Sequence, residues 1–154
     1  MLTVVVTETF PCTPDELLDF VMDVERYALV DRRIRPVRWA RRDGDLLEFA
    51  FRPRLAGIPG PGTVARVRLT PGRRIDVALA PPPANRLTRL ASDFDASFVC
   101  TPVEGGTELV RTLNFRFRPP LRWLAEPLLR RPLTAEAEEE IRLAKEYIQR
   151  QKQT

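Results

Sequence analysis

Residues 7–30 read TETFPCTPDELLDFVMDVERYALV, and this stretch decides the fold because one strand passes directly into two short helices. Residues 2–10 are rich in valine and threonine, which predicts the first strand. The sequence TPDE at 13–16 carries a capping threonine, a proline for the first helical position and a returning glutamate, so a helix is expected from 14 to about 22. Asp23 can cap a second helix at once, and no linker separates the two.

From residue 34 onward the hydrophobic pattern changes to a period of two, which predicts antiparallel strands. The dipeptides at 43–44, 71–72 and 105–106 are turn signals that divide this region into hairpins. The proline-rich segment 55–62, LAGIPGPG, lacks the donors that a strand needs, so we expect a turn or a flexible lip there.

The chain closes with a long helical pattern between residues 120 and about 151. Pro127 and Pro132 are expected to kink or restart this helix, because proline removes a backbone donor. Apolar residues repeat at spacings of four and three along its later part, at Ala137, Ile141, Ala144 and Ile148.

Every predicted strand has one apolar face, and the terminal helix is the large amphipathic element able to cover those faces. The sequence therefore predicts a single α+β domain over residues 1–154, with a curved antiparallel sheet of about six to seven strands wrapped around the C-terminal helix. The two short helices after the first strand should close one end of the sheet. A pocket is expected between these helices, the sheet and the terminal helix.

Composition excludes several kinds of chemistry. The chain contains no histidine, which removes Ser/His/Asp and Cys/His nucleophilic sites and histidine-ligated metals. Cys12 and Cys100 match no zinc spacing and are too few for a disulfide framework, so buried thiols in a cytoplasmic protein are expected. We expect no cofactor, no metal, no signal peptide and no transmembrane segment.

The net charge of +4 comes almost entirely from arginine, since lysine occurs only at Lys145 and Lys152. This bias is typical of a bacterial, GC-rich coding background, and nucleic-acid binding is therefore not favoured. The stretch 32–42 gathers six arginines around Trp39, at Arg32, Arg33, Arg35, Arg38, Arg41 and Arg42. It is interpreted first as a solvated strand edge, and alternatively as a contact for an acidic carrier protein or an anionic surface.

The entry segment CTPDELLDFVMDVERYALV (12–30), the ending GGTELVRTLNFRF (105–117) and the long terminal helix together resemble the START-like helix-grip superfamily (SRPBCC). The similarity is to its polyketide cyclase/dehydrase or coenzyme-Q-binding-like branches, and it covers nearly the whole chain. The resemblance implies an internal cavity for a small molecule, such as the lipids, quinones, polyketides or hormones that relatives bind. The helix prolines and the proline-rich lip depart from the usual pattern of that superfamily.

Arg111 is the sharpest candidate for a binding residue. Strand parity places it among Leu109, Leu113 and Phe115, on a face that is otherwise apolar. An unpaired buried guanidinium costs several kcal/mol, so Arg111 must meet either a carboxylate, carbonyl or phenolate of a ligand or an internal Asp or Glu. The candidate ligand-binding residues are Arg111, Phe49, Phe51, Phe94, Phe98, Leu113, Phe115, Phe117, Trp39, Trp123 and Tyr27.

Three functions follow from these expectations. The first is binding or carrying of a small, mainly apolar ligand, which is a lipid, quinone or polyketide-like molecule. The second is an aromatase/cyclase-type enzyme in which arginine and tyrosine polarise carbonyl groups. The third is an interaction module that uses the stretch 32–42. No catalytic residue is assigned, because Asp76, Asp93 and Asp95 have no spacing that fixes an acid/base pair.

Overall fold

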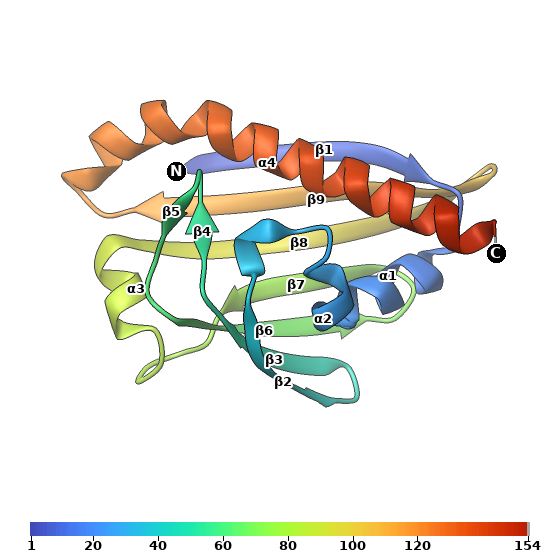
Figure 1. Cartoon of the computed structure of the whole chain (residues 1–154), viewed down its shortest axis with the longest axis horizontal. Coiled ribbons are helices and arrows are strands. Elements are labelled where there is room, and N and C mark those ends of the chain that lie inside the picture. The colour runs from blue at the N-terminus through green and yellow to red at the C-terminus, as the bar shows by residue number, and fades with distance from the viewer. Residues whose placement is uncertain (154) are drawn as a thin grey trace.

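A seven-stranded antiparallel sheet curves beneath the long C-terminal helix in the computed structural model, which describes residues 1–153 (Figure 1). The order of strands in the sheet is β1-β9-β8-β7-β6-β3-β2, and β4 pairs with β5 in a separate hairpin. The strands are β1 (Leu2–Phe10), β2 (Val37–Asp43), β3 (Leu46–Phe51), β4 (Arg54–Leu55), β5 (Ile58–Pro59), β6 (Thr63–Thr70), β7 (Arg74–Leu79), β8 (Ser92–Val103) and β9 (Gly106–Phe117). The helices are α1 (Pro14–Met22), α2 (Val24–Tyr27), the 3-10 helix η1 (Arg32–Ile34), α3 (Arg86–Ala91) and α4 (Leu121–Lys152). The predicted fold class is confirmed.

The entry segment folds as its caps predict. The Thr13 hydroxyl accepts a hydrogen bond from the Glu16 amide, and the Thr13 amide donates to the Glu16 carboxylate, each at 3.2 Å. The Asp23 carboxylate accepts from the Arg26 amide at 3.4 Å and starts α2 directly after α1. This pair of helices closes one end of the sheet and buries Leu17, Leu18, Phe20, Val21 and Met22.

Strand β9 fixes which side chains face the helix. It pairs with β1 and β8 along its length, and its burial alternates residue by residue from Thr107 to Phe115. Arg111 is on the buried face, as strand parity predicts, and lies opposite Phe98 of β8. The sheet therefore presents one arginine to an interior that is otherwise apolar at this level.

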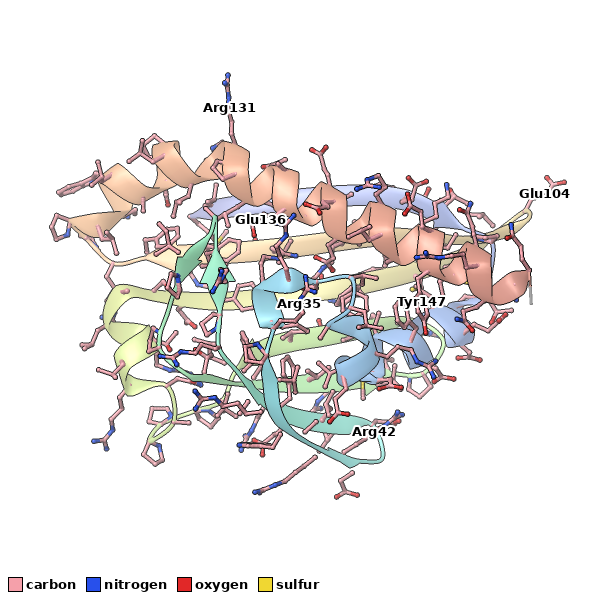
Figure 2. The ribbon with its side chains drawn as sticks, viewed as in Figure 1. Arg35, Arg42, Glu104, Arg131, Glu136 and Tyr147 are labelled. Atoms are coloured by element: carbon pink, nitrogen blue, oxygen red, sulfur yellow. The ribbon has the colours of Figure 1, made fainter. Side chains whose placement is uncertain are left out.

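The prediction that residues 55–62 form an unpaired turn or lip is partly wrong. Arg54 pairs with Pro59 and Leu55 with Ile58, which forms the β4–β5 hairpin. Proline is tolerated there because the strand is two residues long and a proline at its end leaves no ladder donor missing. The tip is attached to α4, since the Ala56 amide donates to the Glu136 carboxylate at 2.5 Å, and Glu136 lies beside this tip in Figure 2.

The predicted restart of the terminal helix is also wrong, because α4 is one helix with Pro127 and Pro132 inside it. Each proline removes one backbone donor, and the ribbon bends in this first half of the helix (Figure 1). The later half is straighter and carries the predicted buried stripe of Ala137, Ile141, Ala144 and Ile148.

Buried apolar residues form two clusters instead of one. The first joins α1 and α2 to β3, β6, β8 and the end of α4, and includes Phe49 and Phe98. The second joins β1 and β9 to the first half of α4, and includes Phe115 and Leu133. The division leaves room between the clusters for a cavity.

Leu133→Ala tests the contact between α4 and the sheet. Leu133 is 0% exposed, so we expect the free energy of unfolding to fall by about 2–5 kcal/mol. Leu128→Ala is the matched control on the same helix, because Leu128 is 63% exposed and its loss should change stability by about 0.5 kcal/mol or less. Urea denaturation of both variants checks this expectation, and equal losses would contradict the packing described.

Candidate functional site

An internal cavity of about 300 Å³ lies between the sheet, η1, α3 and the β4–β5 hairpin. Its walls are mainly apolar, and aromatic rings contact one another along them. Ring centroids are 5.1 Å apart for Phe49 and Phe51, and 5.1 Å apart for Phe94 and Phe115. Nine of the eleven residues proposed from sequence line this cavity, namely Arg111, Phe49, Phe51, Phe94, Phe98, Leu113, Phe115, Phe117 and Tyr27.

The mouth of the cavity is marked by side chains that both line it and meet solvent. Ile58 of the β4–β5 hairpin is 63% exposed, and Leu87 of α3 is 68% exposed. Thr88 of α3 contacts Thr63 of β6 through their hydroxyls at 2.9 Å, which holds α3 over the start of β6. The opening is therefore framed by α3 and the hairpin.

A hollow of this size is costly when it is empty. At about 24 cal/mol per Å³, a dry cavity of about 300 Å³ costs on the order of 7 kcal/mol, which rivals the total stability of a domain. The physical expectation is a cavity that holds a ligand or water.

A buried ion-pair cluster forms one wall of the cavity, and Glu140 of α4 is its centre. The Glu140 carboxylate accepts a hydrogen bond from Arg111 Nε at 3.1 Å and another from Arg33 Nη2 of η1. It also accepts from the hydroxyl of Tyr27, at the end of α2. Glu140 thus links the sheet, the short helices and the terminal helix at one point.

Arg33 is held on its other side by Asp31, which precedes η1. Asp31 Oδ1 accepts from both the backbone amide and Nε of Arg33, each at 3.0 Å. The side chains of Asp31, Arg33, Arg111 and Glu140 are all 6% exposed or less. Two arginines and two carboxylates therefore balance one another without solvent.

Burial and neighbouring charges shift the titration of this cluster. Burial raises the pKa of Glu140, although the charges of Arg111 and Arg33 oppose that shift. Burial also acts to raise the pKa of Asp31, but Arg33 and Arg111 outweigh it and the pKa lies below its ordinary value. Burial and the adjacent Glu140 raise the pKa of Tyr27 well above its ordinary value. Tyr27 is therefore a hydrogen-bond donor at neutral pH and cannot serve as a base.

The cluster still has donors to offer. Nη1 of Arg111 and Nη1 of Arg33 are buried and have no hydrogen-bond partner within residues 1–153. The Arg111 guanidinium also lies over the Phe98 ring, with Cζ 3.9 Å from the ring centroid. Two buried donors of the cluster are thus without partners, and the carboxylates that the structure describes in this wall are all hydrogen-bonded to arginines.

Two of the residues proposed from sequence do not line the cavity. Trp39 is partly buried on β2, where the Arg41 guanidinium lies 4.7 Å from its ring centroid. Trp123 is 69% exposed near the start of α4. Tyr147 of α4, the second tyrosine of the chain, stacks on Phe20 with ring centroids 4.6 Å apart and does not line the cavity either.

The basic stretch 32–42 is not a uniform solvated edge. Arg33 is buried in the ion-pair cluster, which corrects the expectation for that residue. Arg32 pairs with Glu139 of α4, while Arg35 and Arg42 are exposed. A partner for this stretch stays a prediction.

Glu140, Arg33 and Asp31 are site residues that sequence reasoning missed. A signal for Glu140 was present, because it follows Ala137 by three residues and precedes Ala144 by four, which places it on the buried stripe of α4. Arg33 and Asp31 lie in an irregular segment where no periodicity tells which side chains turn inward.

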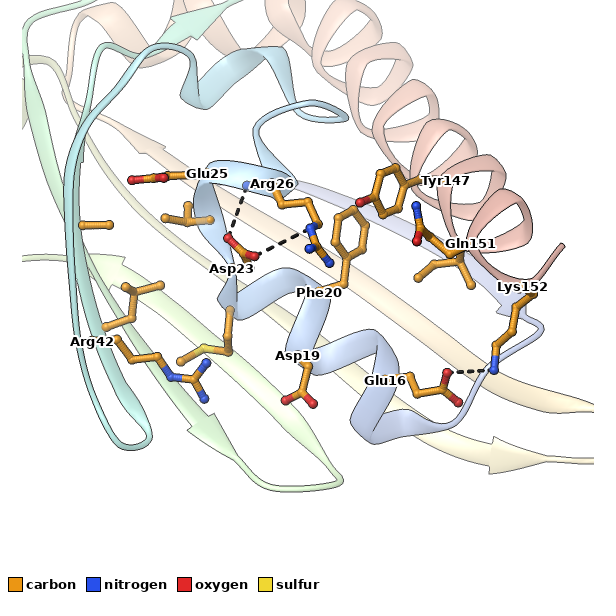
Figure 3. A pocket seen from close by; sticks show the side chains of 15 residues that line it. Glu16, Asp19, Phe20, Asp23, Glu25, Arg26, Arg42, Tyr147, Gln151 and Lys152 are labelled. Atoms are coloured by element: carbon orange, nitrogen blue, oxygen red, sulfur yellow. Dashed lines mark hydrogen bonds and ion pairs between the residues drawn. The ribbon is translucent and has the colours of Figure 1, made fainter. Parts of the chain in front are cut away.

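A second hollow, of about 690 Å³, lies between α1, α2 and the C-terminal end of α4 (Figure 3). Charged residues line much of it, and several are already paired. Glu16 pairs with Lys152 at 2.7 Å, and Asp23 pairs with Arg26 at 3.6 Å. This groove suits an apolar ligand less well than the aromatic cavity does.

Acidic and cysteine side chains, the potential metal ligands of this chain, are dispersed in the structure. No group of three or more metal-ligating residues occurs in the part of the chain that the structure describes. Cys12 and Cys100 are buried free thiols, and burial raises their pKa to about 11 and about 12.

Among the helices of residues 1–153, none is long and apolar enough to cross a membrane.

Replacing Glu140 by glutamine tests the cluster. The change leaves the buried charges of Arg33 and Arg111 facing only Asp31, and we expect a loss of about 3–5 kcal/mol in unfolding free energy. Glu139→Gln is the adjacent control, because its pair with Arg32 is partly exposed and should contribute about 1 kcal/mol or less. Equal losses in chemical denaturation would show that Glu140 is not the centre of the interior.

Comparisons with known proteins agree with this architecture. No curated protein sequence gives a significant match. The zhui aromatase/cyclase from Streptomyces sp. R1128 has a similar fold, with a TM-score of 0.78 and 16% identity over 96% of this chain and 93% of that one. A START superfamily protein from Mycobacterium smegmatis matches with a TM-score of 0.70 and 16% identity, over 97% and 99% of the two chains. The 18 kDa protein CC1736 from Caulobacter crescentus matches over the full length of both chains, with a TM-score of 0.72 and 23% identity.

Residues 1–149 match the family model described as "polyketide cyclase / dehydrase and lipid transport". The matched residues include all seven strands of the sheet, helices α1, α2 and α3 and nearly all of α4. All residues that line the cavity are among them. The chain therefore belongs to the polyketide cyclase/dehydrase and lipid transport family.

Proposed function

We propose that this protein binds a small, mainly apolar molecule in the cavity between the sheet, η1, α3 and the β4–β5 hairpin, with a neutral carbonyl group of the ligand at the arginine wall. One observation carries the proposal: an apolar cavity of about 300 Å³ ends at a buried, charge-balanced cluster with unused donors. This volume is at the lower end of the range for small-molecule sites. The family's description and the folds of its relatives are consistent with ligand binding of this kind.

Charge balance favours a neutral acceptor over an anion. The charges of Arg33 and Arg111 are matched by those of Asp31 and Glu140, so the wall has no net charge to neutralise. A carbonyl oxygen accepts from a free Nη1 and adds no charge. A carboxylate would bring an unmatched negative charge into a site without solvent, which costs several kcal/mol.

Filling the cavity tests whether it is the binding site. Val77 of β7 lines the cavity and Ala78, its neighbour, is exposed on the other face of the strand. Val77→Phe should therefore lower affinity for 2-acetylnaphthalene at least about tenfold, whereas Ala78→Phe should leave it unchanged. Calorimetric titration measures both, and native mass spectrometry of the purified protein should show a bound apolar molecule.

A matched ligand series tests the polar end. We expect 2-acetylnaphthalene to bind about tenfold more tightly than 2-isopropenylnaphthalene, because its oxygen accepts a charge-assisted hydrogen bond that the hydrocarbon cannot form. The anion 2-naphthoate should bind more weakly than the ketone. Tighter binding of the naphthoate would overturn the neutral-carbonyl assignment while leaving the cavity proposal intact.

The double variant Arg111→Met/Glu140→Gln separates recognition from stability. It removes one charge of each sign, so the remaining pair of Arg33 and Asp31 stays balanced. The preference for the ketone over the hydrocarbon should fall to about twofold or less, while affinity for the hydrocarbon persists. An unchanged preference would show that Arg111 does not contact the carbonyl.

A second candidate function is cyclisation of a poly-β-keto chain, and the pair of arginines at an aromatic-walled cavity favours it. Donors that polarise a carbonyl stabilise developing negative charge without any histidine. The absence of an unpaired base in the described wall argues against strong general-base catalysis and places this candidate second. Turnover of a poly-β-keto thioester mimic that vanishes in Arg111→Met/Glu140→Gln would promote it.

A further inference from the structure

Apolar side chains crowd the outside of the molecule around the cavity mouth. Of the large apolar residues that are exposed, more than half come from α3, the β4–β5 hairpin and the first half of α4. These residues, called the mouth rim here, are Ile58, Leu87, Leu90, Leu121, Trp123, Leu124 and Leu128. Ile58 and Leu87 also line the cavity, so the rim is continuous with the apolar interior.

The elements of the rim lie at one end of the molecule. The Arg118 amide donates to the Ala91 carbonyl at 3.0 Å, and its Nε donates to the Arg89 carbonyl at 2.6 Å. These bonds fasten the end of α3 to the residues that lead into α4. Figure 1 shows α3 and the start of α4 together at the end of the sheet opposite α1.

The first half of α4 has two apolar stripes. Ala125, Leu129 and Leu133 pack inward as part of the second core cluster. Leu121, Leu124 and Leu128 repeat at spacings of three and four on another side, and Leu124 and Leu128 are each 63% exposed. No residue between 1 and 153 covers this outer stripe. A helix that needs only one stripe to join the core therefore has a second one facing out.

Positive charge surrounds the rim. Exposed arginines without an ion pair among the described residues flank it at Arg86, Arg118, Arg122, Arg130 and Arg131. The single acidic residue in the stretch 118–131 is Glu126, which pairs with the N-terminal ammonium at 2.7 Å. Arg131 extends away from α4 into open space (Figure 2). The rim thus combines uncovered apolar surface with an excess of positive charge, since Glu126 is the one acidic side chain near Arg122 and Arg130 in the stretch 118–131.

We propose that the mouth rim docks on an anionic lipid bilayer, and that the apolar ligand enters and leaves the cavity from that bilayer. Tryptophan and leucine on a helix flanked by arginines are the side chains that insert at a lipid interface, while the guanidinium groups remain with the lipid phosphates. The second clause rests on the proposed function, because it supposes an apolar ligand in the cavity. The docking clause stands on the rim alone.

Vesicle flotation tests the docking. The protein should float with vesicles that contain phosphatidylglycerol, bind phosphatidylcholine vesicles far less, and lose affinity as salt rises. Leu124→Ser/Leu128→Ser should lower the affinity about tenfold or more. Arg130→Gln/Arg131→Gln should lower it about thirtyfold. Leu29→Ser/Leu46→Ser is the matched control, since these leucines are 62% and 50% exposed on other elements and should have no effect.

Trp123 reports where contact occurs. With Trp39→Phe, Trp123 is the sole tryptophan, and its exposed ring should shift to bluer emission on phosphatidylglycerol vesicles. Lipids brominated in the acyl chain should quench it. Vesicle binding with unchanged Trp123 emission would place the docking surface elsewhere and overturn the proposal. Binding to an acidic carrier protein without any binding to vesicles would also overturn it.

The two proposals fail separately. Val77→Phe, whose cavity is filled, should still float with anionic vesicles, and the Leu124→Ser/Leu128→Ser variant should still bind 2-acetylnaphthalene in vesicle-free solution. If the unmodified protein does not bind 2-acetylnaphthalene but floats with anionic vesicles, the proposed function is contradicted and the docking proposal stands. Loss of vesicle binding with intact ligand affinity would remove the docking alone.

Discussion

The carboxylate of Glu140 is the contact on which the interior of this protein depends. It reaches from the middle of α4 to Arg111 of β9, Arg33 of η1 and Tyr27 of α2, so three layers of the fold meet at one buried group. A buried carboxylate is unfavourable unless its hydrogen bonds are satisfied, and two guanidinium groups and a phenol satisfy this one. These hydrogen bonds, together with apolar packing, fix the position of the terminal helix along the sheet.

The cavity is bounded by the charged wall and by both apolar core clusters. Phe98 lines it from one cluster and Phe115 from the other. The charged groups contact one another instead of solvent, so they define a polar end without requiring an anion. A site with donors and no free base is better suited to recognition than to proton transfer.

The architecture could be predicted from the sequence because alternation and caps are local signals. The inward direction of Arg111 followed from strand parity alone, and α1 and α2 followed from their capping residues. The partner of Arg111 was harder to identify, since Glu140 stands in a run of glutamates and only the helical period distinguishes it. Arg33 lies in an irregular segment, where burial is decided by tertiary contacts that no local pattern encodes. The β4–β5 hairpin was missed because a proline at a strand end is compatible with pairing although proline disfavours strands in general.

The order of the strands has a consequence for how the chain is made. Strand β1 is at the edge of the sheet and its neighbour there is β9, so that Thr3 hydrogen bonds to Asn114, 111 positions later. During synthesis the first strand leaves the ribosome long before its partner exists, and Arg111 is made before the Glu140 carboxylate that pairs with it. Contacts so distant in sequence make folding slow. The nascent chain must therefore keep an apolar strand and the unpaired Arg111 in solution until its last helix has emerged.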